Sequence, residues 1–226
     1  GLDLLDEDDL VKLRRELKEP GPERIFHLAD AFRAGMSVED VHALSFVDPW
    51  FLDQIEELID AEVDVVHRGL DGLDKRYALY SYYLPSDHVV ASHHGLTVII
   101  SRPQRGVVSA QGKRWQHRAR WRWFKQIFGE PGLGRPDLDA EVETSRMKAW
   151  VAKRNLSEEI PVSAAVVFVH PQVQLTVADV AVPVMTASQL PDHLRQGLND
   201  LPIVSTAGQK ELRRALDEAV QSGKRK

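Results

Sequence analysis

The chain has 226 residues, of which 28% are charged and 43% hydrophobic, and it contains no cysteine. This length suffices for one domain with a large core or for two smaller domains, and the apolar content argues against disorder. The lack of cysteine excludes a disulfide scaffold, a thiol nucleophile and a thiolate zinc site.

The ends and the hydropathy of the chain predict its location. No apolar run approaches the roughly 20 residues that span a bilayer. The first six residues carry two aspartates and no basic residue, unlike a signal peptide. We therefore expect a cytoplasmic protein with no membrane partner. Gly1 in place of methionine indicates a processed chain or a fragment of a longer one.

The formal net charge of −5 conceals a strong asymmetry. Residues 1–66 hold 18 acidic and 6 basic residues, a net charge of −12. Residues 67–226 hold 16 acidic and 23 basic residues, a net charge of +7. Eight of these basic residues and no acidic residue lie between Ser101 and Gln126. A split of this size predicts two units with different partners.

The first 66 residues predict helices. A first helix from about Asp8 to Lys18 ends before the turn Pro20-Gly21-Pro22. The second helix ends at Gly35, a left-handed stop, and Ser37 caps a short third helix. Asp48-Pro49 begins the fourth. Apolar residues then recur at helical spacing in the second and fourth helices: Ile25, Leu28, Ala29 and Phe32, then Phe51, Leu52, Ile55, Leu58, Ile59 and Val63.

The hydrophobic period changes to two from about Arg76. We expect short strands over residues 77–84, 88–91, 96–101 and 106–110. A helix over 138–155, buried strands over 162–169 and 182–185, and two terminal helices capped by Ser188 and Thr206 complete the pattern.

This order predicts an α+β fold: a helical unit over residues 1–66 and an α/β domain with a mixed sheet over residues 67–226. We expect the helix that begins at Asp48 to run on into the second unit.

The acidic part resembles the oligomerisation domain of the carbamoyl-phosphate synthase large chain. The stretch from Leu10 to Asp40, with Glu19-Pro-Gly-Pro-Glu-Arg-Ile-Phe at its centre, carries the resemblance, and residues 48–58 continue it. In that family the domain is helical, mediates association of large chains and holds no catalytic residue. The resemblance therefore implies self-association through residues 8–62. It ends near Glu62, about halfway through the family's domain.

The family's ATP sites belong to modules of several hundred residues, which this chain lacks. Likeness to part of an enzyme is not evidence of its reaction. An alternative is that the chain is a fragment or fusion product of a synthase large chain without its ATP-using modules.

The basic part resembles a degenerate nuclease-related (NERD) domain, a family similar to the restriction-endonuclease-like nucleases. Tyr82 to Arg102 and Gly106 to Trp115 carry the resemblance. The family has an aspartate before a strand, a glycine turn, an apolar strand ending in Glu-x-Lys, and then a glycine and a tryptophan. The resemblance implies a restriction-endonuclease-like fold for this part.

In this family two carboxylates would hold Mg²⁺, and the metal would activate water. Asp87 matches the first carboxylate and is the candidate metal ligand. Ile100 stands where the family has glutamate, and Arg102, the second candidate catalytic residue, stands where it has lysine. Arginine stays charged and does not exchange protons readily, although it binds phosphate. A nuclease would need a second acid near Asp87, for which Asp74, Glu141 and Glu143 are candidates.

The basic segment over residues 101–126 interleaves cations with indoles. Cations neutralise phosphates, and tryptophan rings stack on unpaired bases. The residues expected to bind nucleic acid are Arg105, Lys113, Arg114, Trp115, Arg118, Arg120, Trp121, Arg122, Trp123 and Lys125. In the alternative interpretation the tryptophans anchor a core and the arginines form a solvated face or pair with the acidic helices.

His93 and His94 lie at an expected turn, and neighbours on a strand would face opposite sides and chelate poorly. The sequence as a whole favours a non-catalytic assembly or binding protein with no cofactor. A Mg²⁺-dependent nuclease is the alternative, and Mg²⁺ enters only with it.

Overall fold

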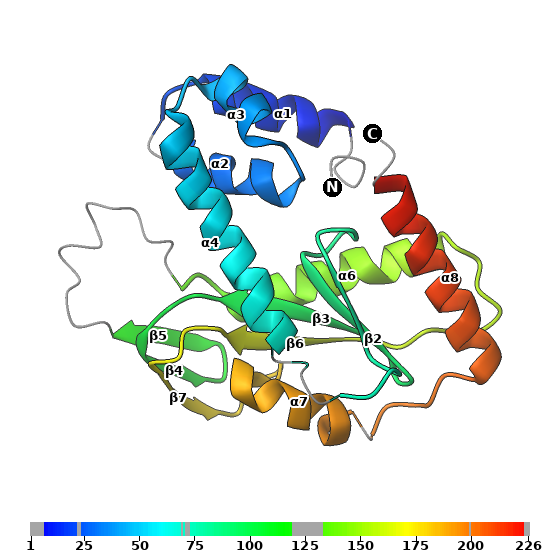
Figure 1. Ribbon diagram of the computed structural model, residues 1–226. Coiled ribbons are helices and arrows are strands. Elements are labelled where there is room, and N and C mark those ends of the chain that lie inside the picture. The colour runs from blue at the N-terminus through cyan, green and yellow to red at the C-terminus, as the bar shows by residue number, and fades with distance from the viewer. Residues whose placement is uncertain are drawn as a thin grey trace.

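The computed structural model describes residues 7–21, 24–68, 70, 73–118, 133–198 and 200–223 (Figure 1). Its architecture is a mixed α+β arrangement of helices and two sheets. No helix within these ranges is long and apolar enough to cross a membrane.

Four helices form the N-terminal part, which we call the helical unit. They are α1 (Glu7–Lys18), α2 (Arg24–Arg33), α3 (Val38–Ser45) and α4 (Pro49–Arg68). A separate cluster of buried side chains holds them together, with Leu17, Ala31, Val41 and Leu52 fully buried at its centre. The predicted apolar faces of α2 and α4 are confirmed in part, because Leu28, Phe32, Ile55 and Ile59 belong to this cluster whereas Ile25 and Phe51 are exposed.

The predicted helix boundaries in this unit are confirmed. Gly35 has φ of +86°, the left-handed conformation that ends α2. The Ser37 hydroxyl accepts a hydrogen bond from the backbone N–H of Asp40 at 3.2 Å. The Asp48 carboxylate accepts one from the N–H of Trp50 at 2.9 Å, and α4 begins at Pro49.

Helix α4 joins the two parts of the molecule. Its first turns pack in the helical unit, whereas Val66, near its end, is fully buried among side chains of the main sheet. The prediction that this helix runs on into the second part is confirmed. Tyr82, in the loop after the first strand, packs against the core of the helical unit and provides a second link.

The main sheet has five strands in the order β1-β2-β3-β6-β8. They are β1 (Ala78–Ser81), β2 (His88–Ser92), β3 (Gly95–Arg102), β6 (Val162–Phe168) and β8 (Val184–Thr186). The strands β1, β2 and β3 pair antiparallel, and β6 is parallel to both β3 and β8. The predicted mixed sheet is therefore confirmed.

Helices cover both faces of this sheet (Figure 1). On one face α6 (Pro136–Ala152) and α8 (Thr206–Gly223) pack over Val98, Ile100 and Val166. The other face, which carries Val90 and Ile99, receives the end of α4, α7 (Leu190–Asp192) and the π-helical turn His193–Gly197.

A second sheet of three strands was not expected from the sequence. Its order is β5-β4-β7, formed by β4 (Gly106–Gln111), β5 (Arg114–Arg118) and β7 (Val173–Ala178). The strand β5 lies within the segment that was interpreted only as a basic run, and β7 was not predicted at all. The helix α8 is capped by Ser205, whose hydroxyl accepts from Gly208 N–H at 3.0 Å. Thr186, rather than Ser188, caps the short 3₁₀ turn Ala187–Gln189.

Candidate functional site

The two candidate catalytic residues lie at the carboxyl end of β3. The antiparallel register pairs His88 with Ile99, so Asp87 lies opposite Ile100 one step further along. Positions 100 and 102 point to the same face of the sheet, the face that α6 covers. The fold therefore gathers Asp87, Ile100 and Arg102 beneath the first turns of α6.

Arg102 is bound by a residue that the sequence did not single out. Its guanidinium forms an ion pair with the carboxylate of Asp139 in the first turns of α6. It also donates to the backbone carbonyl of Ser101 at 3.1 Å. The Arg102 side chain is 20% exposed and that of Asp139 is 48% exposed. Any phosphate that approached Arg102 would have to compete with this carboxylate.

Asp87 has one acidic neighbour from α6. Burial raises the pKa of Glu143, the negative charge of Asp87 raises it further, and Ser86 and Arg146 oppose the rise. Ser86 also donates to the Glu143 backbone carbonyl at 3.3 Å. Of the three acids proposed as a second carboxylate, Glu143 therefore interacts electrostatically with Asp87. Asp74 instead binds Arg76, which holds the pKa of Asp74 at about 2.

These residues make a weak metal centre. The alkyl side chain of Ile100 is 6% exposed and supplies no ligand atom. Across the described part of the chain, no three His, Cys, Asp or Glu residues are grouped so that they could hold a metal ion. The site offers one pair of interacting carboxyl groups and one arginine engaged by a carboxylate.

The basic strand β5 alternates between two environments. Arg114, Gln116 and Arg118 are exposed, and we call these outward side chains the β5 face. Trp115 and His117 point the other way and are partly buried. Lys113 is exposed in the turn before the strand, where Gly112 has φ of +57°.

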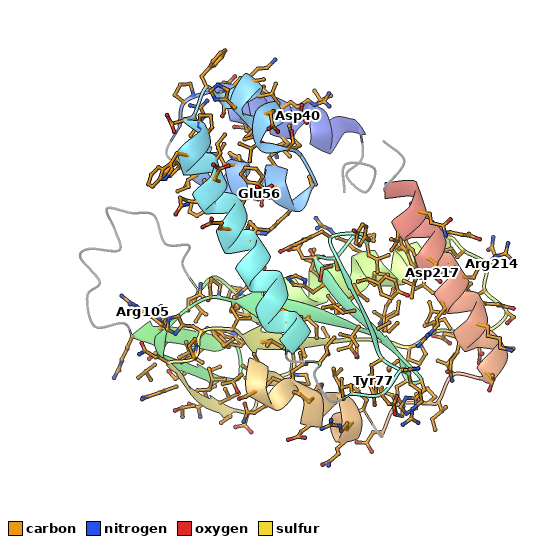
Figure 2. All side chains as sticks on the ribbon, viewed as in Figure 1. Asp40, Glu56, Tyr77, Arg105, Arg214 and Asp217 are labelled. Atoms are coloured by element: carbon orange, nitrogen blue, oxygen red, sulfur yellow. The ribbon has the colours of Figure 1, made fainter. Side chains whose placement is uncertain are left out.

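The neighbouring strands extend the β5 face without acidic residues. The register pairs Gln111 with Arg114, Ser109 with Gln116 and Val107 with Arg118. On β7 the outward positions are Gln174 and Thr176. Arg105 is exposed just before β4, and its backbone carbonyl accepts from the His117 ring at 2.7 Å. Figure 2 labels Arg105 on this side of the molecule, away from Asp40 and Glu56 of the helical unit.

Trp115 packs against the core beneath the second sheet. Its indole nitrogen is buried and finds no hydrogen-bond partner among the residues that can be described. This packing favours the interpretation of Trp115 as a core anchor over base stacking. The predicted nucleic-acid-binding residues Arg120, Trp121, Arg122, Trp123 and Lys125 lie outside the described residues.

The histidine pair lies in the β2–β3 turn, and the expectation that the two rings point apart is wrong. The rings of His93 and His94 are 4.1 Å apart between centroids, because both residues belong to the turn and not to a strand. The His94 ring hydrogen-bonds to the Leu201 carbonyl at 3.2 Å. Burial, with the nearby His94 and Arg76, lowers the pKa of His93.

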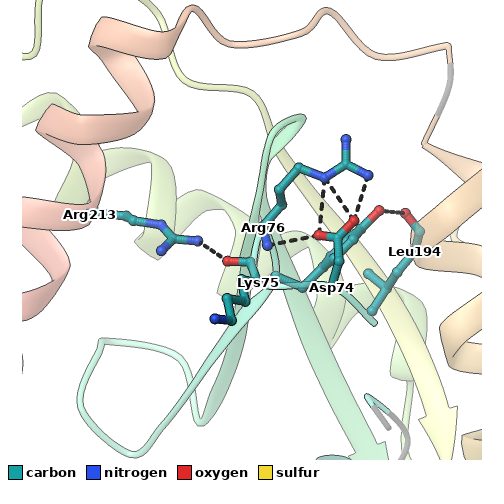
Figure 3. A network of polar contacts seen from close by, with 6 residues as sticks. Asp74, Lys75, Arg76, Leu194 and Arg213 are labelled. Atoms are coloured by element: carbon teal, nitrogen blue, oxygen red, sulfur yellow. Dashed lines mark hydrogen bonds and ion pairs between the residues drawn. The ribbon is translucent and has the colours of Figure 1, made fainter. Parts of the chain in front are cut away.

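A polar network next to this turn ties distant elements together (Figure 3). The Tyr77 hydroxyl donates to the Leu194 carbonyl at 3.1 Å, and its ring contacts His93 edge-on at 5.9 Å. From α8, Arg213 donates to the Lys75 carbonyl at 2.8 Å. These contacts hold the segment before β1 between α8 and the π-helical turn His193–Gly197, which is a structural role.

Comparison with known proteins supports the first of the two resemblances. Residues 1–81 match the family described as "Carbamoyl-phosphate synthetase large chain, oligomerisation domain". The match therefore passes Glu62, where the resemblance was expected to stop. The same comparisons give no support to a nuclease-related domain in the remainder.

Individual relatives agree with the family match. A carbamoyl phosphate synthase large chain of Xanthomonas campestris pv. campestris is 66% identical over 74 residues, which are 33% of this chain and 7% of the relative. Those of Vibrio cholerae and Pseudomonas syringae pv. tomato are 54% and 49% identical over 74 residues, with the same coverage. The chain thus spans about 7% of the length of these relatives. The N-terminal third of this protein is homologous to the oligomerisation domain of the synthase large chain.

Proposed function

We propose that this protein is a non-catalytic assembly protein whose helical unit mediates self-association. The N-terminal third is similar to a domain whose family description is oligomerisation. The proposal uses residues 8–62 as the associating segment and assigns the chain no carbamoyl-phosphate synthesis. The origin of this part as a fragment or fusion product of a large chain agrees with the same homology.

The observation that carries the proposal is a pair of exposed aromatic residues at the corner between α3 and α4. Phe46 is 85% exposed and Trp50 is 69% exposed, although the helical unit has a closed core of its own. Large apolar side chains gathered on a surface are typical of protein contacts, and tryptophan is among the residues that contribute most to them. A second copy of the chain would remove both rings from water.

Sedimentation velocity over a range of protein concentrations tests this proposal. We expect reversible association of the wild type, and we expect Phe46→Ser with Trp50→Ser to weaken it by about tenfold or more, as loss of aromatic anchors does. Ile203→Ser is the matched control, because Ile203 is equally exposed at 69% but lies outside the helical unit. A wild type that stays monomeric at every concentration would refute self-association.

We also propose that residues 67–226 form a degenerate nuclease-related unit with a restriction-endonuclease-like fold. Asp87 directly before β2, the Gly95 turn and the apolar strand β3 ending in Arg102 agree with the family's pattern. The leading helix α4 and the β3–α6–β6 crossover agree with a mixed sheet flanked by helices. In this proposal the unit is not an enzyme and needs no cofactor, because Ile100 and Arg102 replace two residues of the reacting centre.

Binding of nucleic acid by the basic segment is a second candidate function. The observation that favours it is the β5 face, where Arg114 and Arg118 project from a polar sheet surface without acidic residues. Phosphate contacts by such residues give binding that weakens steeply with salt. Fluorescence anisotropy with a labelled oligonucleotide would measure it, and Arg114→Glu with Arg118→Glu should lower the affinity at least about tenfold at low salt. Absent or salt-independent binding would remove this candidate. A cytoplasmic location stays a prediction.

A further inference from the structure

We infer that copies of this chain associate head to tail, with the α3–α4 corner of one copy seated on the β5 face of the next. The inference rests on the proposed self-association and names the surfaces that meet. It starts from the charge split of the chain, −12 over residues 1–66 and +7 over residues 67–226.

The first surface combines aromatic rings with carboxylates, and we call it the acidic–aromatic patch. It comprises the exposed side chains of Phe46, Asp48, Trp50, Asp53 and Glu57. Trp50, Asp53 and Glu57 recur at helical spacing on one face of α4. The two carboxylates have no ion pair with any residue whose placement is described, so their charges face solvent in an isolated copy.

The second surface is the β5 face with Arg114 and Arg118 at its ends. The two arginines are four residues apart on one side of a strand, which separates their Cα atoms by about 13 Å. Residues 50 to 57 of α4 span about 10 Å along the helix axis. Two long arginine side chains can therefore reach Trp50 and the carboxylates of Asp53 and Glu57 together.

The chemistry of the two surfaces is complementary. A guanidinium forms paired hydrogen bonds with carboxylates and stacks on an indole ring, and both partners gain when water is excluded. Opposite charge across an interface also speeds encounter and fixes orientation. A surface that combines carboxylates with an exposed tryptophan matches a sheet surface of arginine and glutamine side chains better than carboxylates or a tryptophan alone would.

The contact has to form between copies. Figure 2 labels Asp40 and Glu56 on the helical unit and Arg105 at the second sheet, apart from both. The charged side chains of Lys113, Arg114 and Arg118 form no ion pair with the helical unit among the residues that the structure describes. In the head-to-tail arrangement each contact leaves one surface of each kind unoccupied on the outer copies, so further copies add to build rings or open chains.

A mixing experiment tests this inference. One variant carries Arg114→Glu and Arg118→Glu, and a second carries Asp53→Arg and Glu57→Arg. Each should associate about tenfold or more weakly than the wild type in sedimentation velocity at low salt, because like charges then face each other. Mixed in equal amounts, the two should associate with each other, since the intact acidic–aromatic patch of one variant meets the intact β5 face of the other and the two reversed surfaces are also opposite in charge.

The control variant reverses two positive charges, as the arginine variant does, at residues outside both proposed surfaces. Lys148→Glu with Lys153→Glu alters two exposed lysines near the end of α6 and should associate like the wild type. All proteins are treated with nuclease beforehand, and association lost on that treatment would overturn the inference. Wild-type association that neither charge variant weakens, or a mixture that stays monomeric, would also overturn it while the proposed self-association stood. A wild type that never associates would refute both.

Discussion

Arg102, at the end of β3, is ion-paired with Asp139 in the first turns of α6. The pair places a carboxylate directly against the guanidinium at the end of β3. It also explains why the arginine is tolerated in a partly buried place, since a desolvated guanidinium needs a partner.

We predict that Asp139→Asn lowers the free energy of unfolding by about 0.5–1 kcal/mol, the range of partly exposed ion pairs. Urea denaturation measures this change. Glu141→Gln is the control, because Glu141 is exposed on the same helix and forms no ion pair among the described residues. Equal stability of both variants and wild type would mean that the pair contributes nothing.

We expect Glu143 to make the free energy of unfolding depend on pH. Its pKa is raised above the ordinary 4.5 by burial and by Asp87, so the folded state disfavours the ionised form. The resulting penalty is absent well below pH 4.5, grows as the pH rises from 4.5 to the raised pKa, and is complete above it. Glu143→Gln should therefore be more stable than the wild type at pH 7 and equal to it near pH 4.

Denaturant unfolding at several pH values measures the stability difference between Glu143→Gln and the wild type, and so tests its sign. Glu141→Gln, at an exposed position two residues earlier on α6, is the control. A Glu143→Gln protein that loses stability relative to the wild type as the pH rises would contradict the assignment.

Replacement of Gly95 by alanine is expected to lower the free energy of unfolding strongly. It has φ of +101° in the β2–β3 turn, and a Cβ atom there would overlap the carbonyl oxygen of Pro161. That carbonyl accepts the hydrogen bond of Leu96 N–H at 2.9 Å, so it cannot move without loss. Gly95→Ala should cost about 3 kcal/mol or more, from backbone strain and overlap together.

Gly112→Ala is the matched comparison for that change. Gly112 has φ of +57° and open space around its Cα, so alanine should cost only about 1–2 kcal/mol. If both variants lost the same free energy of unfolding, in thermal or urea unfolding, the contact with Pro161 would add nothing to the cost of alanine at position 95.

The purified protein should not cleave DNA in the presence of Mg²⁺ or Mn²⁺. The physical reason is that Ile100 offers no ligand atom and that the described residues contain no group of three His, Cys, Asp or Glu side chains that could hold a metal ion. Gel assays with plasmid and single-stranded DNA measure this. Metal-dependent cleavage that disappears in Asp87→Ala would establish the nuclease alternative instead.

Much of the fold could be predicted from the sequence because its signals are local. Proline, glycine and capping residues gave the limits of the first helices, as Ser37 and Asp48 demonstrate. Alternation of apolar and polar residues, together with continuous apolar runs, predicts the strands β2, β3 and β6. The strand β7 also alternates in burial from Val173 to Ala178, and this alternation is the sequence signal that marks it as a strand. The strand β5 has the same two-residue alternation, with Trp115 and His117 on its inward side, but its charged residues obscure it.

The candidate site was less predictable, because its contacts join distant residues. Arg102 and Asp139 are 37 positions apart, and the period of a segment says nothing about which helix will cover its end. Two acids in the first turn of α6, after Arg135-Pro136, were the available hint. His93 and His94 were misjudged because strand geometry was applied to a turn.

Sedimentation velocity of the wild-type chain across concentration and salt tests the central claim most directly. We predict reversible association that weakens with salt and that Phe46→Ser with Trp50→Ser weakens by about tenfold or more. A single monomeric species at every concentration and salt would contradict it.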